Sequence, residues 1–400
     1  MSNHPSHSTD EECRFVMMIR LVVVVLLFMS GVTVVAAEIK IPEPPEIAAT
    51  SWLLIDAASD QVLVEHKART PQPPASLTKI MTSYVAAEEL ESGRIKLTDK
   101  VLISENAWKQ EGSRMFVQVG TEVALEDLLR GVVIQSGNDA TVAIAEHIGG
   151  SEDAFAEMMN KHGKSLGLSG THYFNSTGLP AEGHVTTAWD LAKLSKALIN
   201  RHPDSYRMYS EKTFRWNDID QPNRNRLLWR DRSVDGIKTG HTEEAGFCLV
   251  ASAMRDGMRL ISVVMGTEDD NARMDESQKL LSYGFRHFES REIYAADVVL
   301  KQSEIWYGES DTIDLGLAKS ALVTFPRGHY EDLAVELEVP KILEAPYALG
   351  AEVGTLRVSI EGRKLFEAPL VSLTEVPEAG FISRFFDFIS LFFSQLFGDD

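Results

Sequence analysis

The chain has 400 residues, 44% of them hydrophobic and 24% charged, which is the balance of a globular protein long enough for two or three domains. Its formal net charge of -20 excludes a general nucleic-acid partner, because such partners are bound by clustered lysines and arginines. Only small basic pockets remain available for anionic ligands.

The N-terminal residues have the pattern of an export signal. Arg20 precedes an apolar run from Leu21 to Phe28, and a stretch of small residues ends at Ala37. This pattern predicts a signal peptide over residues 1–37 that is cleaved after Ala37.

An uncleaved membrane anchor over Ile19 to Ala37 is the alternative, since this stretch is nearly long enough to span a bilayer. Either interpretation puts the rest of the chain outside the cytoplasm. Because Asp10 to Glu12 are acidic and suit a signal peptide poorly, we expect translation to begin at Met17 or Met18.

Residues 38–46 are rich in proline and predict a stiff linker, so we expect the folded part to begin near Ile47. Of the two cysteines, Cys13 precedes the predicted cleavage point, and the mature chain would keep only Cys248. We expect Cys248 to be a buried, inert thiol.

Residues 47–290 combine strand-like runs with helical periodicity and predict an α/β domain. Trp52–Asp56 and Gln61–His66 are expected to pair as strands, and Asp256-Gly257 predicts a tight hairpin. The hairpin strands are expected over Gly246–Arg255 and Arg259–Met265, and helices from Ser76 onward and over Leu125–Ile134, Ala140–His147, Ala154–Ser165, Ala188–Ile199 and Ala272–Phe288.

The pattern changes after Glu292. Leu333 to Val339 and Leu356 to Ile360 alternate between apolar and polar residues, and Glu361-Gly362 supplies a turn. Residues 293–375 are therefore predicted to form a small all-β domain.

The segment 381–397 predicts an amphipathic helix, with Arg384, Asp387 and several serines on one face and phenylalanine, isoleucine and leucine on the other. At about 25 Å, and with charges inside it, the helix is too short to span a bilayer, so we expect it to lie in the membrane interface and bind lipid. A helix packed on its own protein is the alternative. Because the polar face has one arginine and no lysine, attachment is expected to depend little on salt.

Ser76 and Lys79 are a candidate nucleophile and base. Three residues apart on a helix, they share one face, and the amine can reach the hydroxyl. A serine hydroxyl is a weak nucleophile until a neighbouring base removes its proton. Taken alone the match is weak, because a helix-capping serine followed by a solvated lysine gives the same pattern.

Two tripeptides strengthen this interpretation. Ser136-Gly137-Asn138 follows a predicted helix, and Lys238-Thr239-Gly240 comes just before the predicted hairpin. Each is compatible with a polar turn, but three motifs in this order and spacing are hard to obtain by chance.

Together with the run Val234 to Thr242, the three motifs resemble those of the low-molecular-mass penicillin-binding D-alanyl-D-alanine carboxypeptidases. The resemblance covers about residues 47–290. It implies a penicillin-binding and β-lactamase-like catalytic domain of α/β (α+β) class with an antiparallel sheet. A small all-β domain and a C-terminal amphipathic anchor are also what that family carries.

The resemblance implies roles for the motif residues. Ser76 would attack the carbonyl between the two terminal D-alanines of a peptidoglycan stem peptide, Lys79 would accept its proton, and an acyl-enzyme would form as D-alanine leaves. Ser136 would relay a proton to the leaving amine with Lys238 tuning it, and Asn138 would hold the substrate's backbone amide. β-Lactams would acylate the same serine, and neither a metal nor another cofactor is implied.

The backbone N–H groups of Ser76 and His241 would face the developing oxyanion. His184 lies near where related β-lactamases carry a deacylating glutamate, but a loop histidine without a chemical role is the preferred interpretation for it.

A carboxypeptidase must also bind a free carboxylate. Lys238, Thr239 and Gly240 would line that part of the site, with Thr239 as a hydroxyl donor. Arg224 matches a family position on the same side of the cleft, and Arg273 is a weaker candidate that could instead order the strand carrying the lysine. For each arginine a surface ion pair is the alternative.

Three other functions stay open: a β-lactamase or a D,D-endopeptidase on the same scaffold, and a non-catalytic wall-binding protein. The membrane helix and the lack of a placed deacylating glutamate weigh against the β-lactamase, and the intact motifs weigh against the wall-binding protein. The expected location is the periplasmic face of the bacterial cytoplasmic (inner) membrane.

Overall fold

The structure, a computed structural model, describes residue 39 and residues 41–397, the last turns of the C-terminal helix by their backbone alone. The predicted signal peptide, the alternative anchor over Ile19 to Ala37 and Cys13 all lie outside the described residues. Within the described residues, no helix is long and apolar enough to cross a membrane.

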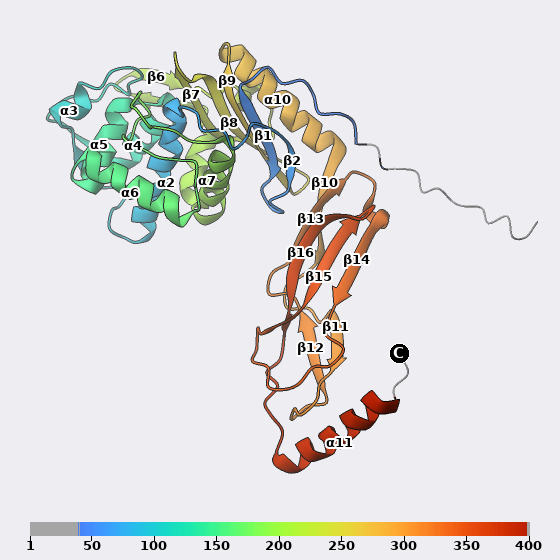
Figure 1. The fold of residues 1–400 in the computed structure, drawn as a ribbon. Coiled ribbons are helices and arrows are strands. Elements are labelled where there is room, and N and C mark those ends of the chain that lie inside the picture. Colours follow the sequence, from blue (N-terminus) through green and yellow to red (C-terminus); the bar gives the residue numbers. More distant parts are fainter. Residues whose placement is uncertain (1–38, 40, 398–400) are drawn as a thin grey trace, which may run out of the picture. The chain divides into compact units, whose positions relative to one another are not determined.

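A five-stranded antiparallel sheet with strand order β2-β1-β9-β8-β7 is the centre of the first part of the described chain, up to residue 287 (Figure 1). The predicted pair at the start of the fold and the Asp256-Gly257 hairpin are both confirmed, and the Lys238-Thr239-Gly240 run lies inside the edge strand β7. The strands are β1 (Ser51–Asp56), β2 (Val62–His66), β7 (Val234–Thr242), β8 (Gly246–Arg255) and β9 (Met258–Thr267).

Both faces of this sheet are covered by helices, α10 (Asp270–His287) on one side and α2 (Lys79–Glu91) and α7 (Ala188–Arg201) on the other (Figure 1). Successive strand residues point to opposite faces, so neighbours enter different cores. Leu53 packs in the core with α2 and α7, whereas Leu54 packs in the core with α10. The continuous apolar runs of β8 and β9 follow from this two-sided burial.

The predicted helices are present, with two differences in their geometry. The helix expected from Ser76 begins as the 3₁₀ turn η1 (Ala75–Thr78), and the helix expected over Leu125–Ile134 continues from α4 (Leu125–Arg130) as the π-helical turn η2 (Gly131–Gln135). The other helices of this part are α3 (Glu105–Trp108), α5 (Asn138–Gly149), α6 (Glu152–Ser165), α8 (Pro203–Tyr206), η3 (Arg207–Ser210) and α9 (Leu227–Arg230). Two small two-stranded sheets pair β3 (Lys100–Leu102) with β4 (Glu122–Ala124), and β5 (Thr213–Trp216) with β6 (Ile219–Pro222).

Contacts to the sheet-and-helix part of the chain begin upstream of the boundary predicted at Ile47. Ile41 packs against the core that includes α10, and the Pro42 carbonyl accepts a hydrogen bond from the Tyr283 hydroxyl at 2.9 Å. The proline-rich segment lacks backbone donors for a sheet or helix, so side-chain packing and carbonyl groups hold it to the domain instead.

From Phe288 to Ser372 the chain is built mainly from β-strands, as predicted. The alternation at Leu356, Val358 and Ile360 is confirmed, since all three side chains are buried. The sequence patterns did not place the individual strands between residues 288 and 326, although most of this region was predicted to be β-rich. The elements are β10 (Phe288–Tyr294), β11 (Lys301–Glu304), β12 (Thr312–Gly316), β13 (Ala321–Pro326), η4 (Tyr330–Asp332), β14 (Leu333–Glu338), β15 (Glu352–Ile360) and β16 (Arg363–Ser372). One sheet has the strand order β11-β12-β16-β15-β14, and the other pairs β10 with β13.

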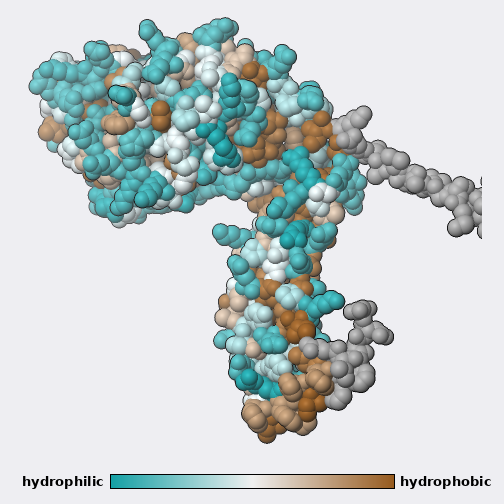
Figure 2. All heavy atoms as spheres, in the orientation of Figure 1, coloured by the Kyte–Doolittle hydropathy of each residue, from teal (hydrophilic) through white to brown (hydrophobic). Residues whose placement is uncertain are grey.

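The predicted amphipathic helix is present as α11 (Phe381–Phe397), and two of its polar residues, Asp387 and Arg384, contact residues outside the helix. The Asp387 carboxylate accepts a hydrogen bond from the Tyr307 backbone N–H at 3.0 Å, and Arg384 pairs with Glu378 at 2.8 Å. Leu391 is buried, but the apolar face is mostly exposed and forms a hydrophobic patch (Figure 2). The patch comprises Phe381, Ile382, Phe385, Phe386, Phe388, Ile389 and Phe392. A helix that hides its apolar face on its own protein, the alternative, is therefore not what the described residues show.

Candidate active site

Ser76 and Lys79 meet at the junction of η1 and α2. The Lys79 ammonium group Nζ lies 3.2 Å from Ser76 Oγ and is completely buried. It also donates to Asn138 Oδ1 at 2.7 Å and to the backbone carbonyl of Thr177 at 2.6 Å. The first two predicted motifs are thus joined directly through one amine.

Burial lowers the pKa of Lys79 from its ordinary value of 10.5 to about 7, because the charged amine loses its hydration. The positive charge of Arg224 lowers the pKa further, while the carboxylates of Asp139 and Glu152 act in the opposite direction. An amine with this pKa is neutral in part of the molecules near pH 7 and can then accept a proton from a hydroxyl.

The Thr177 carbonyl comes from a turn that sequence reasoning did not single out. The Asn175 side chain accepts hydrogen bonds from the backbone N–H groups of Thr177 and Gly178, which folds the turn locally. Gly178 has a φ of 85°, and a Cβ there would lie 1.8 Å from the Ala75 carbonyl oxygen. Only glycine allows this close approach to η1. An Asn-x-x-Gly run is the one sequence signal that could have marked the turn.

Ser136 is held at the end of η2 in a left-handed conformation with a φ of 66°. Its side chain is buried, and its Oγ makes no hydrogen bond with the described residues. A buried hydroxyl without a partner has given up hydration without compensation, which is common where a ligand completes the site. Asn138, two residues on, is fixed by a hydrogen bond from its Nδ2 to the Glu111 carbonyl at 2.6 Å.

Asp139 is a further residue of the site that the motif search missed. Its carboxylate accepts hydrogen bonds from the backbone N–H groups of Met115, Phe116 and Val117 at 2.8 to 3.2 Å. Asp139 therefore fixes the 115–117 segment against the start of α5, next to Asn138. Its position directly after the Ser-x-Asn motif was the available signal.

Strand β7 brings Lys238, Thr239 and Gly240 to the same place. A Cβ on Gly240 would lie 3.0 Å from the Pro74 carbonyl, so the strand packs tightly against the turn that carries Ser76. Lys238 is buried and its Nζ donates to the Thr239 carbonyl at 3.1 Å. Burial, and after it the positive charge of Lys79, hold the pKa of Lys238 well below its usual range.

Arg273 and Arg224 occupy different positions relative to this strand. The Arg273 guanidinium reaches from α10 to the Gly240 carbonyl at 3.0 Å and pairs with Asp270, which fits the predicted alternative that it orders the strand. Arg224 Nε donates to the Gln135 carbonyl at 2.9 Å, and its terminal nitrogens make no hydrogen bond to a described residue.

His241, the residue after the Lys-Thr-Gly motif, stacks on Phe247 of the neighbouring strand with ring centroids 3.9 Å apart. The backbone of His241 belongs to β7, which packs against the turn that carries Ser76.

His184 hydrogen-bonds Thr78 Oγ1 through Nε2 at 2.9 Å and accepts from the Phe174 N–H through Nδ1. Burial, and after it the nearby His172, lower its pKa to about 4, so it is a neutral structural tie to η1.

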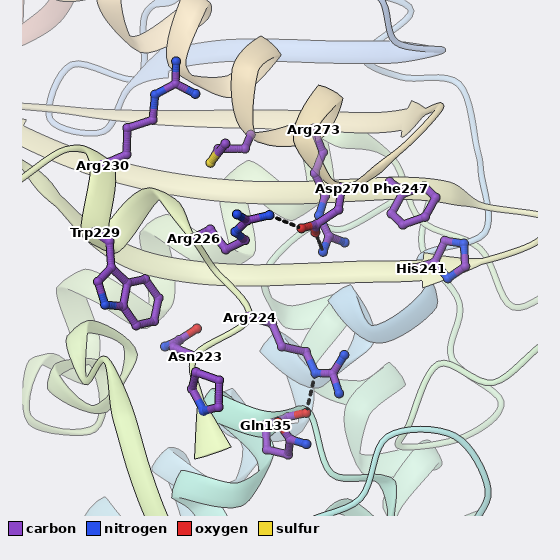
Figure 3. A pocket seen from close by; sticks show the side chains of 12 residues that line it. Gln135, Asn223, Arg224, Arg226, Trp229, Arg230, His241, Phe247, Asp270 and Arg273 are labelled. Atoms are coloured by element: carbon purple, nitrogen blue, oxygen red, sulfur yellow. Dashed lines mark hydrogen bonds and ion pairs between the residues drawn. The ribbon is translucent and has the colours of Figure 1, made fainter. Parts of the chain in front are cut away.

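A pocket of about 1020 Å³ opens beside this constellation (Figure 3). His241 and Phe247 lie at one end of it and Trp229 and Arg230 at the other, with Arg224 between them. Within the described residues, no group of three or more histidine, cysteine and acidic side chains is placed to hold a metal ion.

A serine hydroxyl beside a buried lysine of lowered pKa, a second serine without a partner and a lysine-bearing edge strand define a serine acyl-transfer site of the penicillin-binding class. The profile of the D-alanyl-D-alanine carboxypeptidase family matches residues 38–269, and that of the penicillin-binding protein 5 C-terminal domain matches residues 288–378. The chain belongs to the D-alanyl-D-alanine carboxypeptidase family and is an enzyme of that penicillin-binding type.

The chain is similar to characterised relatives over nearly its whole length. It is 43% identical over 381 residues to D-alanyl-D-alanine carboxypeptidase DacC of Escherichia coli, covering 93% of this chain and 95% of the relative. It is also 43% identical to DacA of the same organism, over 90% of this chain and 91% of the relative. Among solved structures, penicillin-binding protein 5 of Haemophilus influenzae aligns with a TM-score of 0.82 at 40% identity, over 84% of this chain and 100% of that one.

Proposed function

We propose that Ser76 is the nucleophile and Lys79 the general base in the removal of the terminal D-alanine from peptidoglycan stem pentapeptides. The observation that carries this proposal is the buried Lys79 amine, 3.2 Å from Ser76 Oγ and with a pKa lowered to about 7. A base with a pKa near the working pH is populated in its neutral form and still binds a proton strongly enough to assist attack.

In the proposed acylation, Ser76 Oγ attacks the carbonyl carbon between the two D-alanines as its proton passes to Lys79. The backbone N–H groups of Ser76 and His241 donate to the developing oxyanion. The C–N bond then breaks, and the Ser136 hydroxyl, supported by Lys238, delivers a proton to the leaving amine. Water hydrolyses the serine ester and restores the free hydroxyl.

Substrate orientation is assigned to groups that surround this hydroxyl. Asn138, fixed by Lys79 and the Glu111 carbonyl, is proposed to bind the peptide's backbone amide. The Thr239 hydroxyl and the terminal nitrogens of Arg224 are proposed to bind the free carboxylate of the last D-alanine, because a guanidinium fork matches a carboxylate in shape and charge. Arg273 is proposed to act indirectly, by holding the backbone at Gly240.

Residues 47–290 are proposed to carry the reaction, with residues 293–375 as a separate β domain. The chain is proposed to be exported by residues 1–37 and to work at the periplasmic face of the inner membrane. The exposed phenylalanines of α11 support an interfacial anchor, because a patch of this kind is costly to leave in water.

The anchor is tested with vesicles of neutral lipid. The chain is expected to co-sediment with them, and Phe385→Ser together with Phe386→Ser should release it, whereas raised salt should have little effect because α11 has one arginine and no lysine. Binding that survives these substitutions but disappears at high salt would contradict the proposal.

The catalytic proposal is tested with a fluorescent penicillin and with a diacyl-Lys-D-Ala-D-Ala peptide. Stoichiometric labelling and release of D-alanine are expected, and both should be lost in Ser76→Ala. Labelling that persists in Ser76→Ala would exclude Ser76 as the nucleophile. Labelling without D-alanine release would favour a wall-binding protein, and rapid turnover of penicillin would favour a β-lactamase.

A further inference from the structure

The pocket beside His241 is rich in positive charge, although the chain as a whole is acidic. Four arginines line it, Arg224, Arg226, Arg230 and Arg273, against a single carboxylate, Asp270. The lining therefore has a formal surplus of three positive charges in a chain whose net charge is -20. Such a local reversal of sign attracts an anionic ligand.

Local structure explains why two of these arginines point the same way. From Gln221 to Asn225 the side chains alternate between buried and exposed, and the buried members are polar. Asn223 Oδ1 accepts from the Asn225 N–H, and Asn223 Nδ2 donates to the Glu211 carbonyl, which pins the buried side of the segment. Arg224 and Arg226 consequently share the opposite side, which faces the pocket.

The arginines divide into an inner and an outer group. The inner group is Arg224, which donates to the carbonyl of Gln135 next to Ser136, and Arg273, which donates to the Gly240 carbonyl. Among the described residues, Arg226 pairs with Asp270 and donates to Asn271 Oδ1 at 3.3 Å, and Arg230 pairs with Asp275; all of these contacts are exposed. Since Asp270 is shared with Arg273, and exposed pairs contribute little energy, a ligand carboxylate can join or replace these partners at small cost.

The pocket is also too large for the established leaving group. D-Alanine has only a handful of non-hydrogen atoms, whereas about 1020 Å³ is at the upper end of what drug-sized ligands fill. Trp229, with 46% of its surface exposed, lies at the far end from His241 and adds an apolar wall beside Arg230 (Figure 3). A single carboxylate at Arg224 leaves this outer part of the pocket unused.

We propose that the outer pocket is a subsite for a larger leaving group, an amino acid or peptide with one carboxylate beside the scissile amide and a second carboxylate farther along. Arg224 and Thr239 bind the first carboxylate, and Arg226 and Arg230 bind the second. A peptide cross-link between two stems supplies such a leaving amine. The enzyme is thus a D,D-endopeptidase on cross-links as well as a carboxypeptidase, an inference that rests on the proposed function of Ser76.

The bond changes are those of the carboxypeptidase reaction. Ser76 Oγ forms an ester with the carbonyl carbon, the amide C–N bond breaks, and the branched amine leaves with the proton delivered through Ser136. Water then hydrolyses the ester to the free acid, so that one amide and one water become one acid and one amine. No oxidant, reductant or further reactant is required.

The test uses diacyl-Lys-D-Ala-D-X peptides that differ only in the leaving residue X: D-alanine, D-2-aminoadipate, or the neutral side-chain amide of D-2-aminoadipate. The full chain is expected to release the acid with a kcat/KM on the order of tenfold above the amide, the effect of one partly exposed charge-assisted hydrogen bond. Raised ionic strength should reduce this ratio. Equal kcat/KM values for acid and amide would overturn the proposal, and this comparison needs no variant.

The variant R226Q/R230Q is expected to bring the acid-to-amide ratio close to one. The matched control is R215Q, which removes an exposed, ion-paired arginine outside the pocket and should keep the full ratio. A ratio that survives in R226Q/R230Q would assign the charge effect elsewhere and overturn the subsite.

A cross-linked peptide dimer, followed by chromatography of the released monomers, completes the test. Cleavage that is weakened more by R226Q/R230Q than by R215Q supports the subsite, and no cleavage of the dimer overturns the endopeptidase inference. If the unaltered chain releases D-alanine from the first peptide but does not distinguish acid from amide, the proposed function stands and only the subsite fails. If it releases no D-alanine, the proposed function itself fails.

Discussion

The pKa of Lys79 makes the acylation rate a sensitive function of pH. Its lowering from 10.5 to about 7 corresponds to about 5 kcal/mol in favour of the neutral amine. Because the neutral amine is the proposed base, the acylation rate should rise as the pH rises through about 7. About half of the molecules are competent at pH 7 and about a tenth at pH 6.

Arg224→Gln separates the contribution of charge from that of burial. Burial is the larger cause of the lowered pKa and is unchanged by this substitution, but the positive charge of Arg224 is removed. The pKa of Lys79 should therefore rise, and the midpoint of the rate profile should move to higher pH. A rise of only about one pH unit would reduce the neutral fraction at pH 7 from about half to about a tenth.

The assay is the second-order rate constant of acylation by a chromogenic β-lactam between pH 5 and 9, by stopped flow. The midpoint is the readout, because Arg224→Gln is also expected to weaken binding of the β-lactam carboxylate and so to lower the rate at every pH. Arg215→Gln, outside the site, should keep the original midpoint. A profile that is flat through neutral pH, or a midpoint that does not rise in Arg224→Gln, would refute the assignment of Lys79 as the base.

Three other predictions follow from the same contacts. Gly178→Ala should nearly abolish acylation and lower the melting temperature, because its Cβ would lie 1.8 Å from the Ala75 carbonyl oxygen. The control Gly93→Ala, also at positive φ but with nothing within 4 Å of the added Cβ, should lower the melting temperature slightly and leave acylation intact. Equal effects of the two substitutions would contradict this prediction. Burial works to raise the pKa of Asp231, but hydrogen bonds from Ser233 and Gln278 and the charge of Arg255 outweigh it and hold the pKa at about 2 against an ordinary 3.8. Denaturant unfolding of Asp231→Asn should therefore show a loss of about 1 to 2 kcal/mol near neutral pH that disappears as the pH falls through about 2, while the exposed Asp204→Asn should change little. Cys248 is buried and its pKa is raised to about 11, so a thiol reagent should label it only after unfolding; rapid labelling of the native chain would show that the thiol is accessible.

Helices and paired strands were predictable where periodicity was strong. The α7 helix, the β8–β9 hairpin and the alternation in β15 follow directly from which side chains must be buried. Strand β7 was harder to predict, because its glycines and its polar lysine and threonine read as a turn, and its place at the sheet edge comes from pairing with β8. Strands β10 and β13 were not placed either, because they pair with each other across intervening strands, and β11 and β12, although neighbours in sequence, are short.

By itself the sequence determined the chemistry. The order and spacing of Ser76, Lys79, Ser136, Asn138 and Lys238 predict an acyl-serine enzyme, and the phenylalanines of 381–397 predict a membrane-binding helix. Tertiary structure alone decided how these groups are tuned, because desolvation and close packing depend on neighbours far away in the chain. The Asn175 to Gly178 run could have marked a turn, but only the fold shows that this turn brings the Thr177 carbonyl to Lys79 and Gly178 against η1. The pocket beyond Arg224 is likewise assembled from segments that are separate in the sequence.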